Sequence, residues 1–103
     1  LRQMRELYLQ RQHTLRAALA EASNGAWQLA ASDRGMHLLH EVALGTDDET
    51  LSRQAQAAGV MLAPLSRYAM QSARRGWLLG YAGFDEAEIR AAARVVGGLV
   101  RQR

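Results

Sequence analysis

Residues 77–89 read WLLGYAGFDEAEI, a short apolar run that passes through glycine into an acidic segment. Because side chains alternate along a strand, residues 77–82 present two faces. One face carries Trp77, Leu79 and Tyr81, and the other carries Leu78, Gly80 and Ala82. Asp85 and Glu88 then have the spacing of a capping box, in which two side chains satisfy free N–H groups at a helix start. The stretch predicts a strand followed directly by a helix.

The two faces of this strand lead to different expectations. We expect the face with smaller side chains to pack against helices and the aromatic face to remain uncovered. An uncovered apolar face is typical of a domain whose neighbour is absent. One side of the following helix is apolar, with Ile89, Ala92, Ala93, Val96, Leu99 and Val100. Gly97 and Gly98 weaken this helix by about 1 kcal/mol each relative to alanine.

Residues 2–22 predict a long amphipathic helix. The residues of its inner face recur at three- and four-residue spacings, namely Met4, Leu7, Tyr8, Arg11, Leu15, Ala18, Leu19 and Ala22. Gly25 ends the helix, since glycine takes the left-handed conformation of a helix C-cap without steric cost. The chain begins inside this pattern, at Leu1, without a capping residue. We therefore expect it to be a piece of a longer protein.

The middle of the chain predicts a hairpin. Two short apolar stretches, 27–31 and 36–44, flank a turn-rich tetrapeptide at 32–35. Adjacent strands separated by so few residues pair most simply in the antiparallel sense. After them, residues 46–49 read TDDE, which has the spacing of a capping box on Thr46. We expect a helix from about Asp47 to Gly59.

The remaining segments complete an α+β fold. Residues 60–62 predict a third strand, which Pro64 should stop because proline has no amide to donate to a strand ladder. Residues 65–76 are expected to be irregular or a short helical turn. The order of elements predicts a two-layer sandwich. It comprises a three- to four-stranded, mainly antiparallel sheet with helices on one face, preceded by the long amphipathic helix.

Composition limits the chemistry that this chain can perform. It contains thirteen arginines and ten acidic residues, but neither lysine nor cysteine. The missing lysine excludes a Schiff base with pyridoxal phosphate and a phosphate-loop lysine. The net charge of +3 is spread along the chain rather than clustered, which disfavours nucleic-acid binding. No apolar run approaches the length of a membrane-spanning helix.

Candidate polar residues are few. His37 and His40 are three apart, which on a strand places them on opposite faces, and we expect no metal site there. One of the two is expected to be a partly buried structural histidine. Arg67, Arg74 and Arg75 flank the irregular segment, where an arginine can hold a carboxylate or phosphate through two parallel hydrogen bonds. The alternative for these arginines is a solvated loop.

Four segments together resemble a known family. They are LRxMRxxYxxRxxxLxxAL at 1–19, GMHL at 35–38, GVxxxPLSxY at 59–68, and GxxLGYA at 76–82 with a following helix that contains Glu88 and Ile89. In this order and spacing they resemble the C-terminal end of MocR-type transcription regulators. Those regulators join a GntR-type winged-helix DNA reader to a domain similar to fold-type I aminotransferases, which uses pyridoxal phosphate to sense an amino compound.

The resemblance implies a division of this single domain. Residues 1–24 would be the connecting helix and 25–103 the small C-terminal subdomain. The cofactor lysine would lie in the large subdomain of the same parent chain, so this chain alone binds no cofactor covalently. The residues expected to face the effector cleft are Pro64, Ser66, Arg67, Tyr68 and Leu78. DNA would be contacted only through the separate winged-helix domain of a cytoplasmic, homodimeric parent.

The resemblance leaves two readings of the parent open. In fold-type I enzymes this strand often carries an arginine that clamps the substrate carboxylate, and Leu78 stands at that position. The missing clamp disfavours an ordinary α-amino-acid transaminase and any carboxylate-binding role for this strand. The alternative is the small subdomain of a true class I/II aminotransferase. A third hypothesis, from another class, is an arginine-rich module that binds nucleic acid directly.

Overall fold

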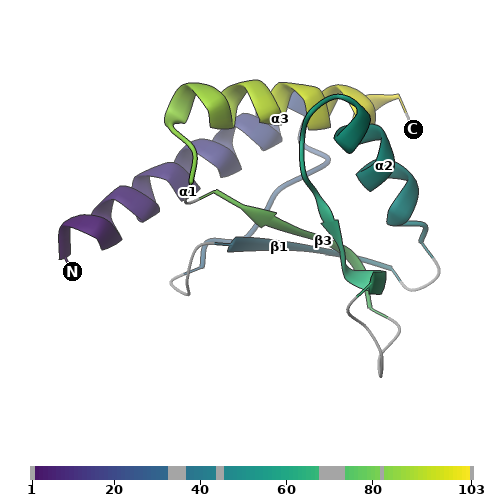
Figure 1. The fold of residues 1–103 in the computed structure, drawn as a ribbon, viewed down its shortest axis with the longest axis horizontal. Coiled ribbons are helices and arrows are strands. Elements are labelled where there is room, and N and C mark those ends of the chain that lie inside the picture. Colours follow the sequence, from purple (N-terminus) through teal and green to yellow (C-terminus); the bar gives the residue numbers. More distant parts are fainter. Residues whose placement is uncertain (1, 33–36, 44–45, 68–73, 82, 103) are drawn as a thin grey trace.

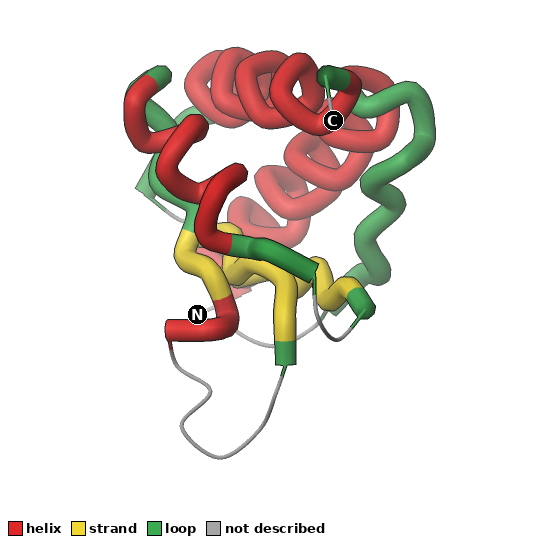
Figure 2. The backbone as a smooth tube through the Cα atoms, turned by 90° about the vertical axis from the view of Figure 1, so that its right-hand side faces the viewer, coloured by secondary structure: helices red, strands yellow, loops and turns green. Residues whose placement is uncertain are grey.

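The computed structural model describes residues 2–32, 37–43, 46–67, 74–81 and 83–102. Its elements are, in order, α1 (Arg2–Ala22), β1 (His37–Val42), α2 (Glu49–Ala57), β2 (Ala63–Pro64), the short 3-10 helix η1 (Leu65–Arg67), β3 (Arg75–Gly80) and α3 (Glu86–Arg101). Figures 1 and 2 show the helices gathered on one side of the strands. The predicted α+β fold with a layer of helices on one face of the sheet is confirmed.

The described sheet has three strands in the order β1-β3-β2, and both pairings are antiparallel. The predicted hairpin between 27–31 and 36–44 is wrong, because β1 pairs with β3 and residues 27–32 form no strand. Side chains of α1 explain the difference. The Gln12 amide donates to the Ser32 carbonyl at 2.7 Å and accepts from its N–H at 2.9 Å, while Arg16 Nε donates to the Leu29 carbonyl at 2.8 Å. These backbone groups therefore need no neighbouring strand.

The central strand turns its aromatic face inward, opposite to our expectation. Trp77, Leu79 and Tyr81 are 3%, 4% and 1% exposed. Leu38 of β1 lies opposite Leu79, and His40 lies opposite Trp77. The aromatic face packs inward because its burial removes more apolar area from water than burial of the face with Gly80 would. The uncovered face is the one with Leu78 and Leu39, the latter being 42% exposed.

Helices α2 and α3 differ in how they begin. The predicted capping box at Asp85 is confirmed, with Asp85 accepting from the Glu88 N–H at 2.8 Å and Glu88 accepting from the Asp85 N–H at 3.0 Å. The predicted box at Thr46 is wrong. Helix α2 starts at Glu49, and Asp47 Oδ1 accepts hydrogen bonds from the backbone N–H groups of Glu49 and Thr50. Asp47 therefore takes the role expected of Thr46.

The third strand is shorter and later than predicted. Residues 60–62 form no strand, and β2 consists of Ala63 and Pro64 opposite Leu78 and Trp77. Because β2 is an edge strand, the missing proline N–H leaves no ladder partner on β3 unsatisfied. Residues 65–67 form the expected helical turn, η1.

Helices α1 and α3 pack closely at their C-terminal halves. Ser23 and Gly25 donate backbone N–H groups to the last turns of α1, and Gly25 has the positive φ of +83° that we expected at this cap. Gly97 of α3 lies against Ala22, so that an added Cβ would lie 2.3 Å from the Ala22 Cβ and 2.5 Å from its carbonyl carbon. The glycine therefore permits the close approach of the two helices.

Gly97→Ala is expected to lower the free energy of unfolding by about 2 kcal/mol, because overpacking pushes the two helices apart. Gly98→Ala is the matched control, since its Cβ would meet nothing nearer than Arg101 Nη2 at 4.0 Å. This control should raise stability by up to about 1 kcal/mol through helix propensity. Urea denaturation of both variants measures the difference, and equal effects would contradict the packing role of Gly97.

Candidate functional site

A buried carboxylate joins three elements at one end of the sheet. Asp48, which precedes α2, is 1% exposed. Its Oδ1 accepts from the Ser66 hydroxyl at 2.6 Å, and its Oδ2 accepts from the Ser66 N–H at 3.0 Å and the Gly76 N–H at 3.1 Å. Its main-chain oxygen accepts from Trp77 Nε1 at 2.8 Å. This Asp48 junction fixes η1 and the start of β3 to the N-terminus of α2.

The Asp48 junction contains an ionised acid. Burial by itself raises the pKa of Asp48, but the hydrogen bonds from Ser66 and Gly76 and the charge of Arg75 outweigh burial and hold the pKa below its usual value. The carboxylate then accepts from all three donors. A protonated acid would instead bring a hydrogen toward groups that already donate, so the ionised form belongs to the folded state.

The structure describes four of the five residues expected to face the effector cleft, and they lie on or near the Asp48 junction. Pro64 is fully buried in β2, Ser66 is half-buried with its hydroxyl engaged by Asp48, and Arg67 is exposed. Leu78 is half-buried and lies opposite Ala63, so β2 and β3 bring these residues to neighbouring positions. Tyr68 lies outside the described residues.

The three arginines expected to hold an anion have different surroundings. Arg74 donates to both carboxylate oxygens of Glu41, at 3.1 and 3.2 Å. That contact lowers the pKa of Glu41, and it raises the pKa of Arg74. Arg75 donates to the Arg74 carbonyl at 3.0 Å. Among the described residues no carboxylate pairs with Arg67, which is exposed.

The histidines follow the predicted split. His40 is half-buried; its ring stacks on Trp77 at a centroid distance of 5.9 Å and is tilted against Trp27 at 4.3 Å, whereas His37 is exposed on the other face. Burial lowers the pKa of His40, which keeps the imidazole neutral inside this aromatic cluster. Within the described ranges, no three histidine, aspartate or glutamate side chains gather where they would hold a metal ion.

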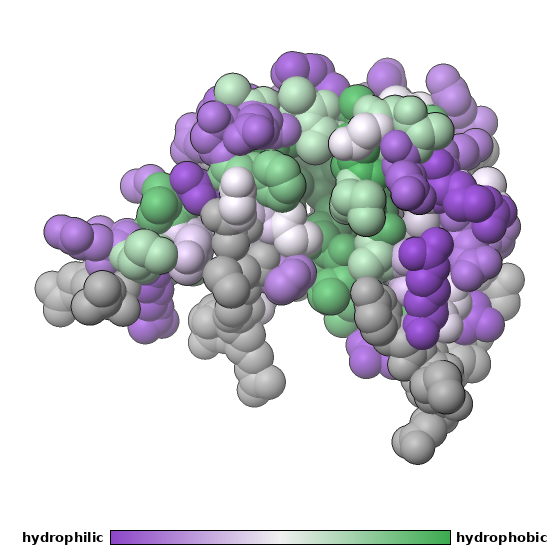
Figure 3. Space-filling model, in the orientation of Figure 1, coloured by the Kyte–Doolittle hydropathy of each residue, from purple (hydrophilic) through white to green (hydrophobic). Residues whose placement is uncertain are grey.

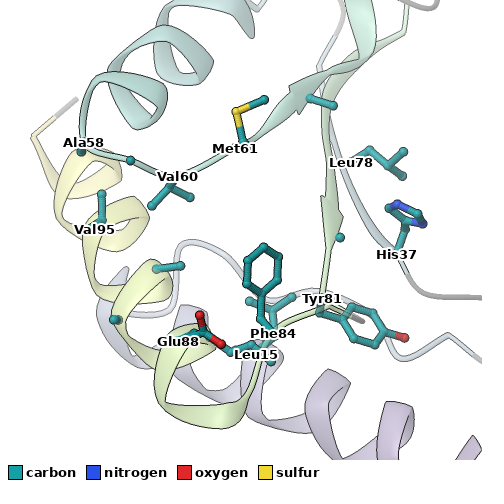
Figure 4. Close-up of a pocket in the computed structure, with 16 residues that line it drawn as sticks. Leu15, His37, Ala58, Val60, Met61, Leu78, Tyr81, Phe84, Glu88 and Val95 are labelled. Carbon is teal, nitrogen blue, oxygen red and sulfur yellow. The ribbon is translucent and has the colours of Figure 1, made fainter. Parts of the chain in front are cut away.

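An apolar groove runs beside this site, between β3, α3 and the segment that joins α2 to β2. Figure 3 shows it as a hollow lined by hydrophobic residues, and Figure 4 shows its side chains. Its volume is about 760 Å³. Val60 and Val95 lie at one end and Leu78 and His37 at the other, with Phe84 between them. Met61 and Phe84 are 77% and 49% exposed there.

Sequence reasoning predicted neither this groove nor the Asp48 junction, although Leu78, which lines the groove, was expected at the effector cleft. The groove is lined by separate segments spread from Leu15 to Val95, so no local pattern marks it. Asp48 was interpreted as part of a helix start, where acids are common. The exposed methionine and phenylalanine beside glycines were the available signal, since large apolar side chains at turns often border binding surfaces.

Comparison with known proteins identifies the family. No protein-family model matches the chain. Over 92 residues, or 87% of its length, it is 39% identical to a probable rhizopine catabolism regulatory protein MocR of Rhizobium meliloti. The chain is homologous to part of a MocR-type regulator. The resemblance to MocR that the four sequence segments indicated is therefore confirmed. The matched region spans only 18% of the length of the MocR relative.

None of the described helices has both the length and the hydropathy that crossing a membrane requires.

Proposed function

We propose that this chain is the small, effector-side subdomain of a transcription regulator whose sensor domain resembles fold-type I aminotransferases. The 39% identity to a regulatory protein is the observation that carries the proposal. In the parent, the subdomain moves against a large subdomain when an amino compound binds, and this population shift reaches a separate winged-helix DNA-binding domain. The parent is a cytoplasmic homodimer in this proposal.

Two surfaces support a packing role against the rest of the parent. The sheet leaves one face uncovered, with Leu39 and Leu78 on it. The first turns of α1 carry exposed Met4, Leu7 and Leu9, and Figure 1 shows that this end of the helix extends beyond the strands. Apolar area of this kind is removed from water when a neighbouring unit covers it. Residues 1–24 accordingly act as the connecting helix, and 25–103 form the subdomain.

The residues of this chain do not fit a covalent pyridoxal phosphate site. The cofactor links to proteins through a lysine amine, and the sequence contains no lysine. Ser66 is engaged by the buried Asp48, so its hydroxyl is not free for a phosphate. Arg67 is the exposed cation at this edge. The chain therefore contributes one wall, and the lysine belongs to the large subdomain.

The proposal requires the parent to bind pyridoxal phosphate covalently outside these 103 residues. After incubation with the cofactor and borohydride reduction, mass spectrometry of the parent should find the adduct on a lysine of another segment. The same treatment of this chain should give none. An adduct on this chain would contradict the proposed division of roles.

The regulator also requires coupling between effector and DNA. We expect an amino compound to change the affinity of the cofactor-loaded parent for its operator DNA, as measured by fluorescence anisotropy. A parent that binds no DNA but turns over an amino donor and an oxo acid would instead be an aminotransferase. Salt-sensitive binding of duplex DNA by the 103-residue chain would favour the third hypothesis, direct nucleic-acid binding.

A further inference from the structure

The groove beside β3 has the size and lining of a small-molecule site. Its volume of about 760 Å³ falls within the usual range of roughly 300–1,000 Å³ for ligand pockets. Most of its lining is hydrocarbon, contributed by Val60, Met61, Ala92 and Val95 among others. A cavity of this kind gains most from a ligand with an apolar body, because the ligand and the lining lose water together.

Glu88 is the charged side chain in the lining of the groove. In the described part of the chain no arginine lines the groove, and none forms an ion pair with Glu88. Glu88 Oε1 accepts the Asp85 N–H at 3.0 Å, and within the described ranges no hydrogen bond reaches its second carboxylate oxygen. Glu88 belongs to the first turn of α3, which also contains Glu86. These acids exceed the partial positive charge of a helix N-terminus, which is about half an elementary charge.

Phe84 adds a second group that attracts cations. Figure 4 shows its ring rising into the groove, with the Glu88 carboxylate to the lower left of the ring. The ring precedes the N-cap, where it can pack against Ile89 as a hydrophobic staple, yet 49% of the residue is exposed. An aromatic face beside a carboxylate is a favourable environment for an ammonium group.

We propose that this groove binds a small organic amine. Its ammonium group lies against Glu88 and Phe84, and its hydrocarbon body extends along Met61 toward Val60 and Val95. An acidic ligand would be repelled by Glu88, and a neutral one would lose the charged contact. The groove reaches Leu78 at one end but is not lined by Arg67, and the proposal does not depend on the proposed function.

The test compares three probes of equal shape, 4-phenylbutylamine, 4-phenylbutan-1-ol and 4-phenylbutyric acid. Titration calorimetry of the 103-residue chain should give an affinity for the amine at least about tenfold above that for the acid, because a charge-assisted contact replaces a repulsion. The Met61 methyl resonance should shift with the amine, which locates the probe. Absence of amine binding, or equal binding of the acid, would overturn the proposal.

Matched variants separate the charge from the fold. Glu88→Gln keeps the capping box, since glutamine also serves at this position, and should reduce amine affinity about tenfold while leaving the alcohol unaffected. Glu86→Gln changes the same helical turn outside the groove and should have no effect, because Glu86 contacts Arg90. Ala91→Phe should fill the groove and abolish binding of the amine. Equal effects of the two glutamine variants would overturn the assignment of Glu88.

The same titration in the longer parent protein tests whether the groove is free there. Binding of the amine with the same Glu88 dependence supports the proposal. If the parent does not bind the amine while this chain does, a segment of the parent fills the groove, and the proposal is overturned. Neither outcome affects the expected result of the cofactor-labelling experiment. The amine-binding proposal and the proposed function can therefore be overturned separately.

Discussion

Replacing Gly76 by alanine is expected to lower the free energy of unfolding by at least about 4 kcal/mol, which is most of the stability of a small domain. Gly76 has φ of +139°, a conformation that residues with a Cβ rarely adopt. An added Cβ would lie 2.1 Å from the His40 carbonyl oxygen and 2.8 Å from the Glu41 Cα. Both contacts are backbone atoms of β1, so no side-chain rotation relieves them, and the central strand pairing must open.

Gly83→Ala provides the matched control for Gly76. A Cβ at residue 83 would have no neighbour within 4 Å, so the change is expected to stay within about 0.5 kcal/mol. Circular dichroism during urea denaturation measures the unfolding free energy of both variants. If Gly76→Ala does not fold at all, its loss from the soluble fraction shows this. A Gly76→Ala variant with the midpoint of the unchanged chain would contradict the close approach of β1 and β3.

Local sequence patterns predicted the elements whose ends are determined by their own residues. The capping box at Asp85 and the glycine after α1 determine helix ends through contacts within a few residues. The segment 27–31 has the composition of a strand, but its backbone is satisfied by Gln12 and Arg16 of α1. A contact between residues 20 apart is invisible to a local pattern, and here it overrides strand propensity.

The direction of β3 illustrates the same limit. Side-chain alternation correctly divided the strand into two faces. Which face packs against the helices depends on the apolar surface that the helices present, and the sequence of the strand does not contain that information. Leu19, Leu51 and Ile89 form a wide apolar surface that the aromatic side chains of the strand cover. The residues expected at the cleft, including Leu78 and Ser66, were identified by resemblance rather than by chemistry, and their role there stays a prediction. Asp48 was missed, since its partners lie 18 to 29 residues away.

Asp48 connects the local fold to the proposed function. Its carboxylate accepts hydrogen bonds from Ser66 of η1 and from Gly76 of β3, and Asp48 itself is the N-cap residue of α2. Movement of η1 relative to α2 would break these hydrogen bonds. We therefore expect Ser66 and Arg67 to move together with the helical layer as one unit when the subdomain shifts against its neighbour, rather than as an independent loop.

Asp48→Asn is expected to lower the free energy of unfolding by about 3–5 kcal/mol at pH 7. The substitution keeps the size of the side chain but turns an amide N–H₂ toward groups that already donate, and each hydrogen bond lost from a charged acceptor costs about 1.5–3 kcal/mol. Asp47→Asn is the control, because Asp47 is an exposed cap whose loss should cost far less. Urea denaturation compares the two, and equal losses would show that the junction does not stabilise the fold.

The contribution of Asp48 should also depend on pH in a defined direction. Its folded pKa lies below the unfolded value of about 3.9, so the unfolded chain binds the proton more readily. The stabilisation is therefore complete above the unfolded pKa and is lost as the pH falls through the folded pKa. The difference in unfolding free energy between the unchanged chain and Asp48→Asn should narrow over that interval. The pH dependence contributed by other acids, including Asp47 and Glu41, is the same in both proteins and cancels in this difference. A gap that stays constant or widens on acidification would mean that the carboxylate is not held ionised by Ser66 and Gly76.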